Sequence, residues 1–202
     1  MNDLNPVEKY PSLTDVRLSL LAEALRDVRE TTLALYDPLS GDNEWSHGCR
    51  VYARSIFRIK QLALEHSWLS VVGEDAKLRF TFAVEGIPIR FYKGSPDDPP
   101  SNYLVTTFGE LLQRQLFEGL HPLDKILRLA VETDREGHVT TVKLVELDQA
   151  GESTGIYLIP REVRPGNVTV LESKPIHLPA IQLTPRTAEE EGEKSKRNVV
   201  RQ

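Results

Sequence analysis

The stretch LRFTFAVEGIPIRFY, residues 78–92, predicts a two-stranded β-hairpin. Apolar side chains alternate with polar or small ones on both sides of Glu85-Gly86, which is the period of two expected for strands. A two-residue loop at Glu85-Gly86 pairs Val84 with Ile87 and Phe82 with Ile89. All the apolar side chains of the hairpin then share one face: Leu78, Phe80, Phe82, Val84, Ile87, Ile89 and Phe91.

Pro88 interrupts this alternation without breaking the predicted register. It falls opposite residue 83 in a non-hydrogen-bonded pair, where the ladder needs no N–H donor. On its other side Pro88 has no N–H to give to a third strand. The sequence therefore predicts a sheet edge beside Pro88.

Two long amphipathic helices are predicted before the hairpin. Apolar residues of the first recur at helical spacing: Val16, Leu20, Leu21, Ala24, Leu25, Val28, Thr32 and Leu35. Pro38 ends it, and Asp42 or Asn43 is the expected N-cap of the second, which runs from about 44 to 66. Its apolar stripe is Trp45, Cys49, Tyr52, Ile56, Ile59 and Ala63. The short connection favours an antiparallel helical hairpin over residues 12–66.

The remainder of the chain adds one short helix and more strands. Thr107 is a typical cap for a helix that Gly119 would end, and residues 125–148 read as a second hairpin that turns at 134–137. GIYLIP at 155–160 and NVTVLES at 167–173 read as two further strands. Helices segregated from an antiparallel sheet of about six strands indicate an α+β fold.

The domain plan follows from this order. Residues 1–11 are a flexible lead-in, and residues 12–173 form one α+β domain, in which 77–173 hold the sheet and the inserted helix. Residues 174–202 lack the apolar content for a core and are expected to be an extended or disordered arm. The segment SKPIHLPAIQLTP at its start is apolar enough to dock on a partner.

Composition narrows the class of protein. Among 202 residues there is one cysteine, so no intrachain disulfide or thiolate metal cluster is expected. The start of the chain has no basic and apolar leader, and no apolar run is long enough to span a membrane, so we expect a cytoplasmic location without membrane contact. A net charge of −5 at pH 7 argues against indiscriminate coating of nucleic acid.

The run Ser46-His47-Gly48-Cys49 resembles the active-site signature of the L,D-transpeptidases, which cross-link cell walls. The resemblance implies a nucleophilic thiol beside a backbone oxyanion site. It covers these four residues alone, and the second, upstream histidine of the family has no counterpart, because no histidine precedes His47.

The helical pattern gives Cys49 a different place. Residues two apart on a helix point about 200° from one another, so His47 does not face Cys49. Cys49 lies on the apolar stripe, where a thiol behaves as a small buried hydrophobe. We therefore predict a core position for Cys49 and no catalytic residue. The histidines also lack metal-ligand spacing, so neither a metal nor another cofactor is predicted.

Two sets of residues are candidates for binding. Arg50, Arg54 and Arg58 recur every four residues and can hold phosphates or an acidic partner; the favoured alternative is that they pair with first-helix acids, namely Glu23, Asp27 and Glu30. On the polar face of the hairpin, Arg79, Arg90 and Tyr92 combine an aromatic with arginines, as binding surfaces do, although a solvated sheet face has the same composition.

These observations favour a non-catalytic protein-interaction or regulatory module, a partner or neutraliser of a larger protein, with a homodimer as one form of that interaction. The alternative is an enzyme or nucleic-acid-binding protein that uses the row Arg50, Arg54 and Arg58.

Overall fold

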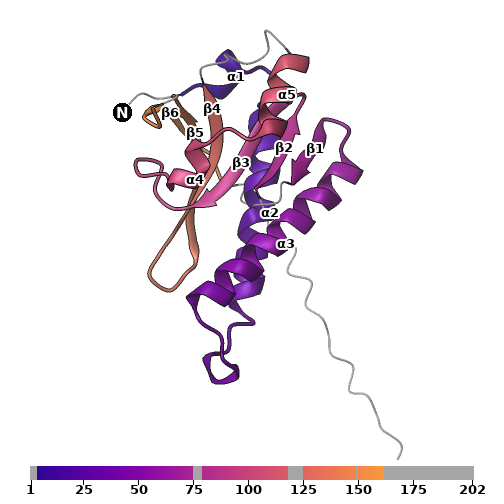
Figure 1. Ribbon diagram of the computed structural model, residues 1–202. Coiled ribbons are helices and arrows are strands. Elements are labelled where there is room, and N and C mark those ends of the chain that lie inside the picture. The colour runs from indigo at the N-terminus through magenta and orange to yellow at the C-terminus, as the bar shows by residue number, and fades with distance from the viewer. Residues whose placement is uncertain (1–3, 75–78, 118–124, 149, 162–202) are drawn as a thin grey trace, which may run out of the picture. The chain divides into compact units, whose positions relative to one another are not determined.

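The computed structural model in Figure 1 describes residues 4–74, 79–117, 125–148 and 150–161. Residues 1–163 belong to one compact unit. The α+β class is confirmed, with N-terminal helices and a six-stranded sheet. The predicted strand 167–173 and the predicted arm 174–202 lie outside the described residues.

The described residues include two long helices and several short helical segments. They are α1 (Pro6–Lys9), α2 (Asp15–Leu33), the 3₁₀ turn η1 (Pro38–Ser40), α3 (Glu44–Glu65), α4 (Ser101–Leu104) and α5 (Phe108–Leu116). The strands are β1 (Leu69–Glu74), β2 (Phe80–Val84), β3 (Ile87–Lys93), β4 (Ile126–Thr133), β5 (Val139–Leu147) and β6 (Ser153–Leu158).

The strands lie in the sheet in chain order, from β1 to β6. Neighbours are antiparallel, as predicted, except that β3 and β4 are parallel. A parallel pair needs a connection that crosses a face of the sheet, and here that connection carries α4 and α5. The sequence did not predict β1, which completes the six strands within the described residues.

The β2–β3 hairpin has the predicted register. Val84 pairs with Ile87, and Phe82 with Ile89. Glu85 and Gly86 have φ of 47° and 86°, so both loop residues are in the left-handed region that a type I′ turn requires. The local alternation and the Glu85-Gly86 turn were thus sufficient to fix this register.

Gly86 makes this turn sensitive to substitution. A Cβ there would lie 2.5 Å from Cγ of Phe117, on top of the strain of a positive φ. We expect Gly86→Ala to cost about 1–3 kcal/mol in the free energy of unfolding, measured with urea. Gly41→Ala is the control, because its φ is 92° and nothing lies within 4 Å of the added atom. Equal losses in the two variants would contradict a role for the Phe117 contact.

The edge predicted beside Pro88 is wrong, because β3 lies inside the sheet between β2 and β4. Pro88 is opposite Ala83, as expected. On the other side, the β3–β4 register begins at Ile89 opposite Leu127, one residue later. The missing N–H therefore falls just before the second ladder and costs it no hydrogen bond.

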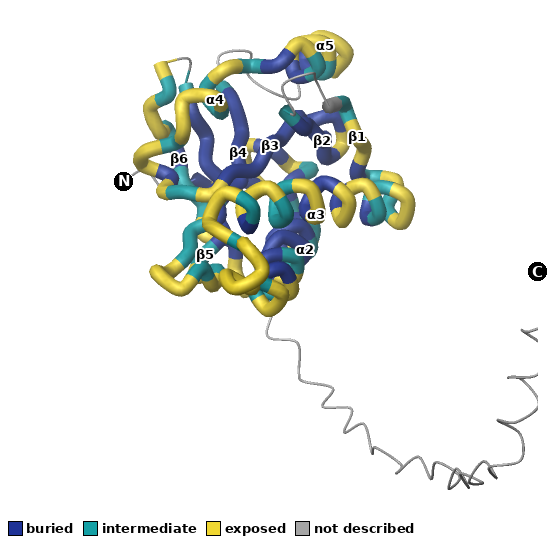
Figure 2. Tube along the Cα trace, turned by 60° about the horizontal axis from the view of Figure 1, so that its bottom comes forward, coloured by how far each residue is buried: buried dark blue, intermediate teal, exposed yellow. Residues whose placement is uncertain are grey.

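The helices α2 and α3 form the predicted antiparallel pair and cover one face of the sheet (Figure 1). The rings of Tyr36 and His47 are 5.7 Å apart at one end, and Arg17 lies 5.3 Å from the Trp68 ring at the other. Figure 2 shows the buried residues concentrated in the sheet and α2.

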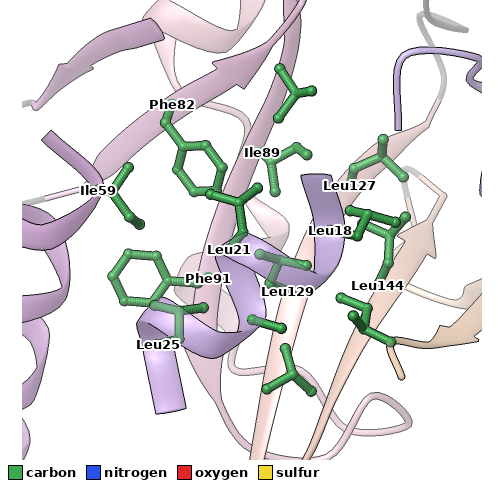
Figure 3. Packing of buried hydrophobic residues seen from close by; sticks show 14 of the residues in the cluster. Leu18, Leu21, Leu25, Ile59, Phe82, Ile89, Phe91, Leu127, Leu129 and Leu144 are labelled. Atoms are coloured by element: carbon green, nitrogen blue, oxygen red, sulfur yellow. The ribbon is translucent and has the colours of Figure 1, made fainter. Parts of the chain in front are cut away.

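The main core lies between these helices and the sheet. Its side chains come from both layers (Figure 3), among them Leu18, Leu21, Leu25, Ile59, Phe82, Ile89, Phe91, Leu127, Leu129 and Leu144. The buried side of α2 is turned from the predicted stripe, since Leu18 is fully buried and Val16 is 71% exposed.

The N-terminal segment is packed, which corrects the expected flexible lead-in. Leu4, Tyr10 and Leu13 are buried in the main core, and the N–H of Leu4 donates to the carbonyl of Ile156 in β6. Leu4, Tyr10 and Leu13 suffice to hold the segment because all three join the same core, whereas Val7 stays 41% exposed.

Candidate functional site

The second face of the sheet is covered by α4 and α5. Arg90 and Tyr92 are each 1% exposed, so the alternative of a solvated sheet face does not hold for them. Arg90 donates from Nη1 to the carbonyl of Val105 at 3.1 Å, and its guanidinium lies 4.8 Å from the ring of Tyr103. Arg79 is half-buried at the start of β2. A role of these residues in binding stays a prediction.

A buried carboxylate explains how Arg90 is held. Arg90 and Arg128 are neighbours in the parallel β3–β4 register, so two like charges lie side by side. Glu110 of α5 lies over them, with Oε1 at 2.5 Å from Nη1 of Arg128 and Oε2 at 3.9 Å from Nη1 of Arg90. It also accepts from the N–H of Thr107 at 2.7 Å, within the capping box that starts α5. This network joins α5 to the sheet.

The net effect of these contacts is to hold Glu110 ionised. Burial raises the pKa of its carboxyl group, but the charge of Arg128, the Thr107 N–H and the Arg128 hydrogen bond outweigh burial and lower the pKa below its ordinary value. The three charges therefore form a structural ion cluster.

This network turns the apolar side of α5 outward. Glu110 and Arg114 are buried, whereas Phe108 and Leu116 are each 75% exposed and Leu112 is 42% exposed. We call the exposed apolar residues Phe108, Leu111, Leu112 and Leu116 the α5 face. An amphipathic pattern alone would assign these residues to the core. Only the buried partner of Glu110, which comes from β4, reveals the opposite orientation.

The arginine row on α3 has partners that differ from those expected. Arg50 forms a salt bridge with Asp42. Arg54 donates to Oγ1 of Thr32 at 3.2 Å, and Arg58 lies 3.9 Å from Glu65. Among the described residues, the first-helix acids Glu23 and Glu30 pair with Arg26 and His138 instead. Arg50 and Arg58 therefore pair with carboxylates close to them in the sequence, and within the described structure only Arg54 of the three arginines contacts α2.

The SHGC run forms the beginning of α3. Ser46 closes a capping box with Asn43, which confirms the predicted N-cap. His47 is buried, and neither ring nitrogen has a hydrogen-bond partner in the described structure, so the imidazole does not contact the thiol of Cys49 as a base. This geometry counts against the transpeptidase resemblance.

Cys49 is exposed, which corrects the predicted core position. The second half of α3 packs on the sheet through Ile56, Ile59 and Leu62, whereas Trp45 near its start is 77% exposed. The predicted stripe extends about two turns too far toward the N-terminus, because a single helix pattern does not show where the opposing layer ends.

Trp45 and Cys49 border a pocket whose lining is mainly apolar. Its volume is about 370 Å³, and helices α2, α3 and α4 and strands β3 and β4 contribute to it. We call it the Trp45 pocket. Its lining residues are Leu25, Arg29, Glu44, Trp45, Gly48, Cys49, Val51, Tyr52, Ser55, Phe91, Tyr92, Lys93, Tyr103 and Val131. Of the residues predicted to bind, it includes Tyr92 and none of the arginines.

Two further findings concern metals and membranes. Over the described ranges, no three His, Cys, Asp or Glu side chains are grouped so as to hold a metal ion. None of the described helices is both long and apolar enough to cross a membrane.

Comparisons with protein-family models, with curated proteins and with solved structures found no match to this chain. The candidate sites are therefore the α5 face and the Trp45 pocket, as derived from the geometry.

Proposed function

We propose that this chain is a non-catalytic protein-interaction module, and that it docks on a second copy of itself through the α5 face. The observation that carries the proposal is the outward apolar side of α5. A cytoplasmic location is part of the same proposal.

The α5 face has the composition of a protein interface. Phe108, Leu112 and Leu116 are four residues apart and lie along one side of the helix. A contiguous exposed apolar surface of this kind marks an interaction site more often than an isolated exposed leucine does. The helix cannot bury this side by rotating, because rotation would break the ion pair of Glu110 with Arg128.

The absence of charge on this face favours a second copy as the occupant. In a two-fold interface the same patch occurs on both partners, so a charged patch would meet its own sign. Both charged residues of α5, Glu110 and Arg114, are buried. Two copies can therefore bring Phe108 of one α5 against Leu116 of the other without like-charge repulsion, although the whole chain carries −5.

We expect Leu112→Glu to raise the dimer dissociation constant by at least about tenfold, because each dimer would bury two carboxylates against apolar surface. Sedimentation equilibrium over a range of concentrations measures the change. Leu64→Glu is the control, since Leu64 is 83% exposed on α3, away from the α5 face. A wild-type chain that stays monomeric throughout, or equal effects of the two variants, would contradict the proposal.

The alternative, nucleic-acid binding by the arginine row, has less support. Arg50 and Arg58 each have a carboxylate partner, and Arg54 is engaged by Thr32. A phosphate would have to displace these contacts.

A further inference from the structure

We propose that the Trp45 pocket binds a small molecule that has a flat apolar body and one anionic group, such as a carboxylate or a sulfonate. This site is separate from the α5 face and does not depend on self-association. The proposal rests on the volume and walls of the pocket and on two cations, Arg29 and Lys93, with which no carboxylate of the described residues forms a salt bridge.

The walls of the pocket suit a flat apolar body. Tyr52 and Phe91 have their rings 5.5 Å apart, and Val131 adds an aliphatic side chain from β4. The indole of Trp45, 77% exposed, borders the same space. A volume of about 370 Å³ lies within the usual range of ligand sites. Aromatic side chains on several sides favour a ligand with one or two rings.

Arg29 supplies a buried positive charge at this pocket. It is 4% exposed, and its Nε donates to the carbonyl of Gly137 at 2.7 Å, a neutral acceptor. Within the described structure, no salt bridge neutralises it; Glu30 and Asp134 act on it from further away. A buried guanidinium without an ion pair is costly. An anion in the pocket would offset that cost.

Lys93 supplies a second cation from the end of β3. It is exposed and lines the pocket, and no carboxylate of the described residues forms a salt bridge with it. Glu44, exposed at the start of α3, is the one acid among the lining residues, and water screens its charge as it screens that of Lys93. The two cations, Arg29 and Lys93, therefore outnumber it. The polar groups of the site thus favour an anion over a cation.

The same charges affect the pKa of the neighbouring His47. Burial lowers the pKa of its imidazole, and Arg29, Arg50 and Lys93 lower this pKa further, against a smaller opposing effect of Asp42. Arg29 and Lys93 therefore act on one region from two elements, α2 and β3. A positive region next to aromatic walls is the complement of an aromatic anion.

Two fluorescent probes test this directly: 1-anilinonaphthalene-8-sulfonate and its neutral analogue N-phenyl-1-naphthylamine. We expect the sulfonate to bind with one high-affinity equivalent, and about tenfold more tightly than the neutral probe. Energy transfer from tryptophan to the bound probe reports where the probe binds. The chain has two tryptophans, Trp45 and Trp68. Loss of most of the transfer in Trp45→Phe, with the transfer kept in Trp68→Phe, is expected.

Lys93→Gln separates the anion contribution from apolar binding. We expect it to weaken the sulfonate at least about threefold and to leave the neutral probe unchanged, since Lys93 is exposed and its loss spares the core. Bound sulfonate should also slow labelling of Cys49 by a neutral thiol reagent. Leu112→Glu is the matched control, because it alters the α5 face alone.

Three results would overturn the proposal. Equal affinity for the two probes, or an unchanged sulfonate affinity in Lys93→Gln, would remove the anion preference. Loss of probe binding in Leu112→Glu, with binding intact in the Trp45 and Lys93 variants, would assign the probe to the α5 face. A monomeric wild-type chain would contradict the proposed dimer and leave the probe result standing.

Discussion

Replacing Glu110 with alanine is expected to destabilise the fold by about 3–5 kcal/mol, the range for removing one partner of a buried ion pair. Arg128 is fully buried and Arg90 is 1% exposed, so water cannot replace the lost carboxylate. The variant would leave two guanidinium groups side by side on β3 and β4. The N–H of Thr107 would also lose its acceptor.

Urea unfolding followed by circular dichroism measures this loss. Gln115→Ala in the same helix is the control, because Gln115 is exposed and a substitution there is expected to change stability by less than about 0.5 kcal/mol. The double variant Glu110→Leu, Arg128→Leu should recover part of the loss, since it removes one of the two uncompensated charges and leaves only Arg90. A single variant within about 1 kcal/mol of wild type would show that the ion pair is not essential.

The same carboxylate predicts a pH dependence. The folded-state pKa of Glu110 is lowered, so the unfolded chain binds more protons as the pH falls toward the ordinary carboxyl range. Its contribution is therefore complete above the unfolded pKa and is lost as the pH falls through the folded pKa. The difference in unfolding free energy between wild type and Glu110→Gln should shrink on acidification below about pH 4. A difference that stays constant with pH would contradict the lowered pKa.

The sequence predicted what is encoded locally. The β2–β3 register follows from alternation and a two-residue turn, and the start of α3 follows from a cap at Asn43. The parallel β3–β4 pair was missed because its strands are separated by the connection that carries α4 and α5, and no local pattern encodes the direction in which a chain returns.

The candidate sites depend on the same kind of long-range information. The α5 face is exposed because Glu110 finds Arg128 on a strand that follows in the sequence, and the Trp45 pocket is assembled from five separate elements. The sequence alone shows that Trp45, Cys49 and Lys93 carry an aromatic ring, a thiol and an amine. It does not show that the three side chains line one cavity. Only Tyr92 was both predicted to bind and found there.

The packed N-terminal segment gives the second large prediction: Tyr10→Ala should cost about 3–5 kcal/mol, the usual loss for truncating a buried aromatic side chain. Tyr10 is fully buried in the main core, and its hydroxyl donates to Glu146 of β5. Glu146 is also held by Nζ of Lys9 at 2.6 Å and by Oγ1 of Thr154 at 2.8 Å. The substitution therefore removes an aromatic ring from the core and one of three donors from a buried carboxylate.

Two comparisons divide this loss between the ring and the hydroxyl. Tyr10→Phe keeps the ring and should cost about 1 kcal/mol, because Lys9 and Thr154 still bind the carboxylate. Val7→Ala, at a residue 41% exposed in α1, controls for general effects on the segment and should be close to neutral. Urea unfolding of all three variants distinguishes the cases. If Tyr10→Ala were no worse than Val7→Ala, the first residues would be a detachable extension. A loss near the expected range makes them part of the core, in which the ring of Tyr10 is fully buried.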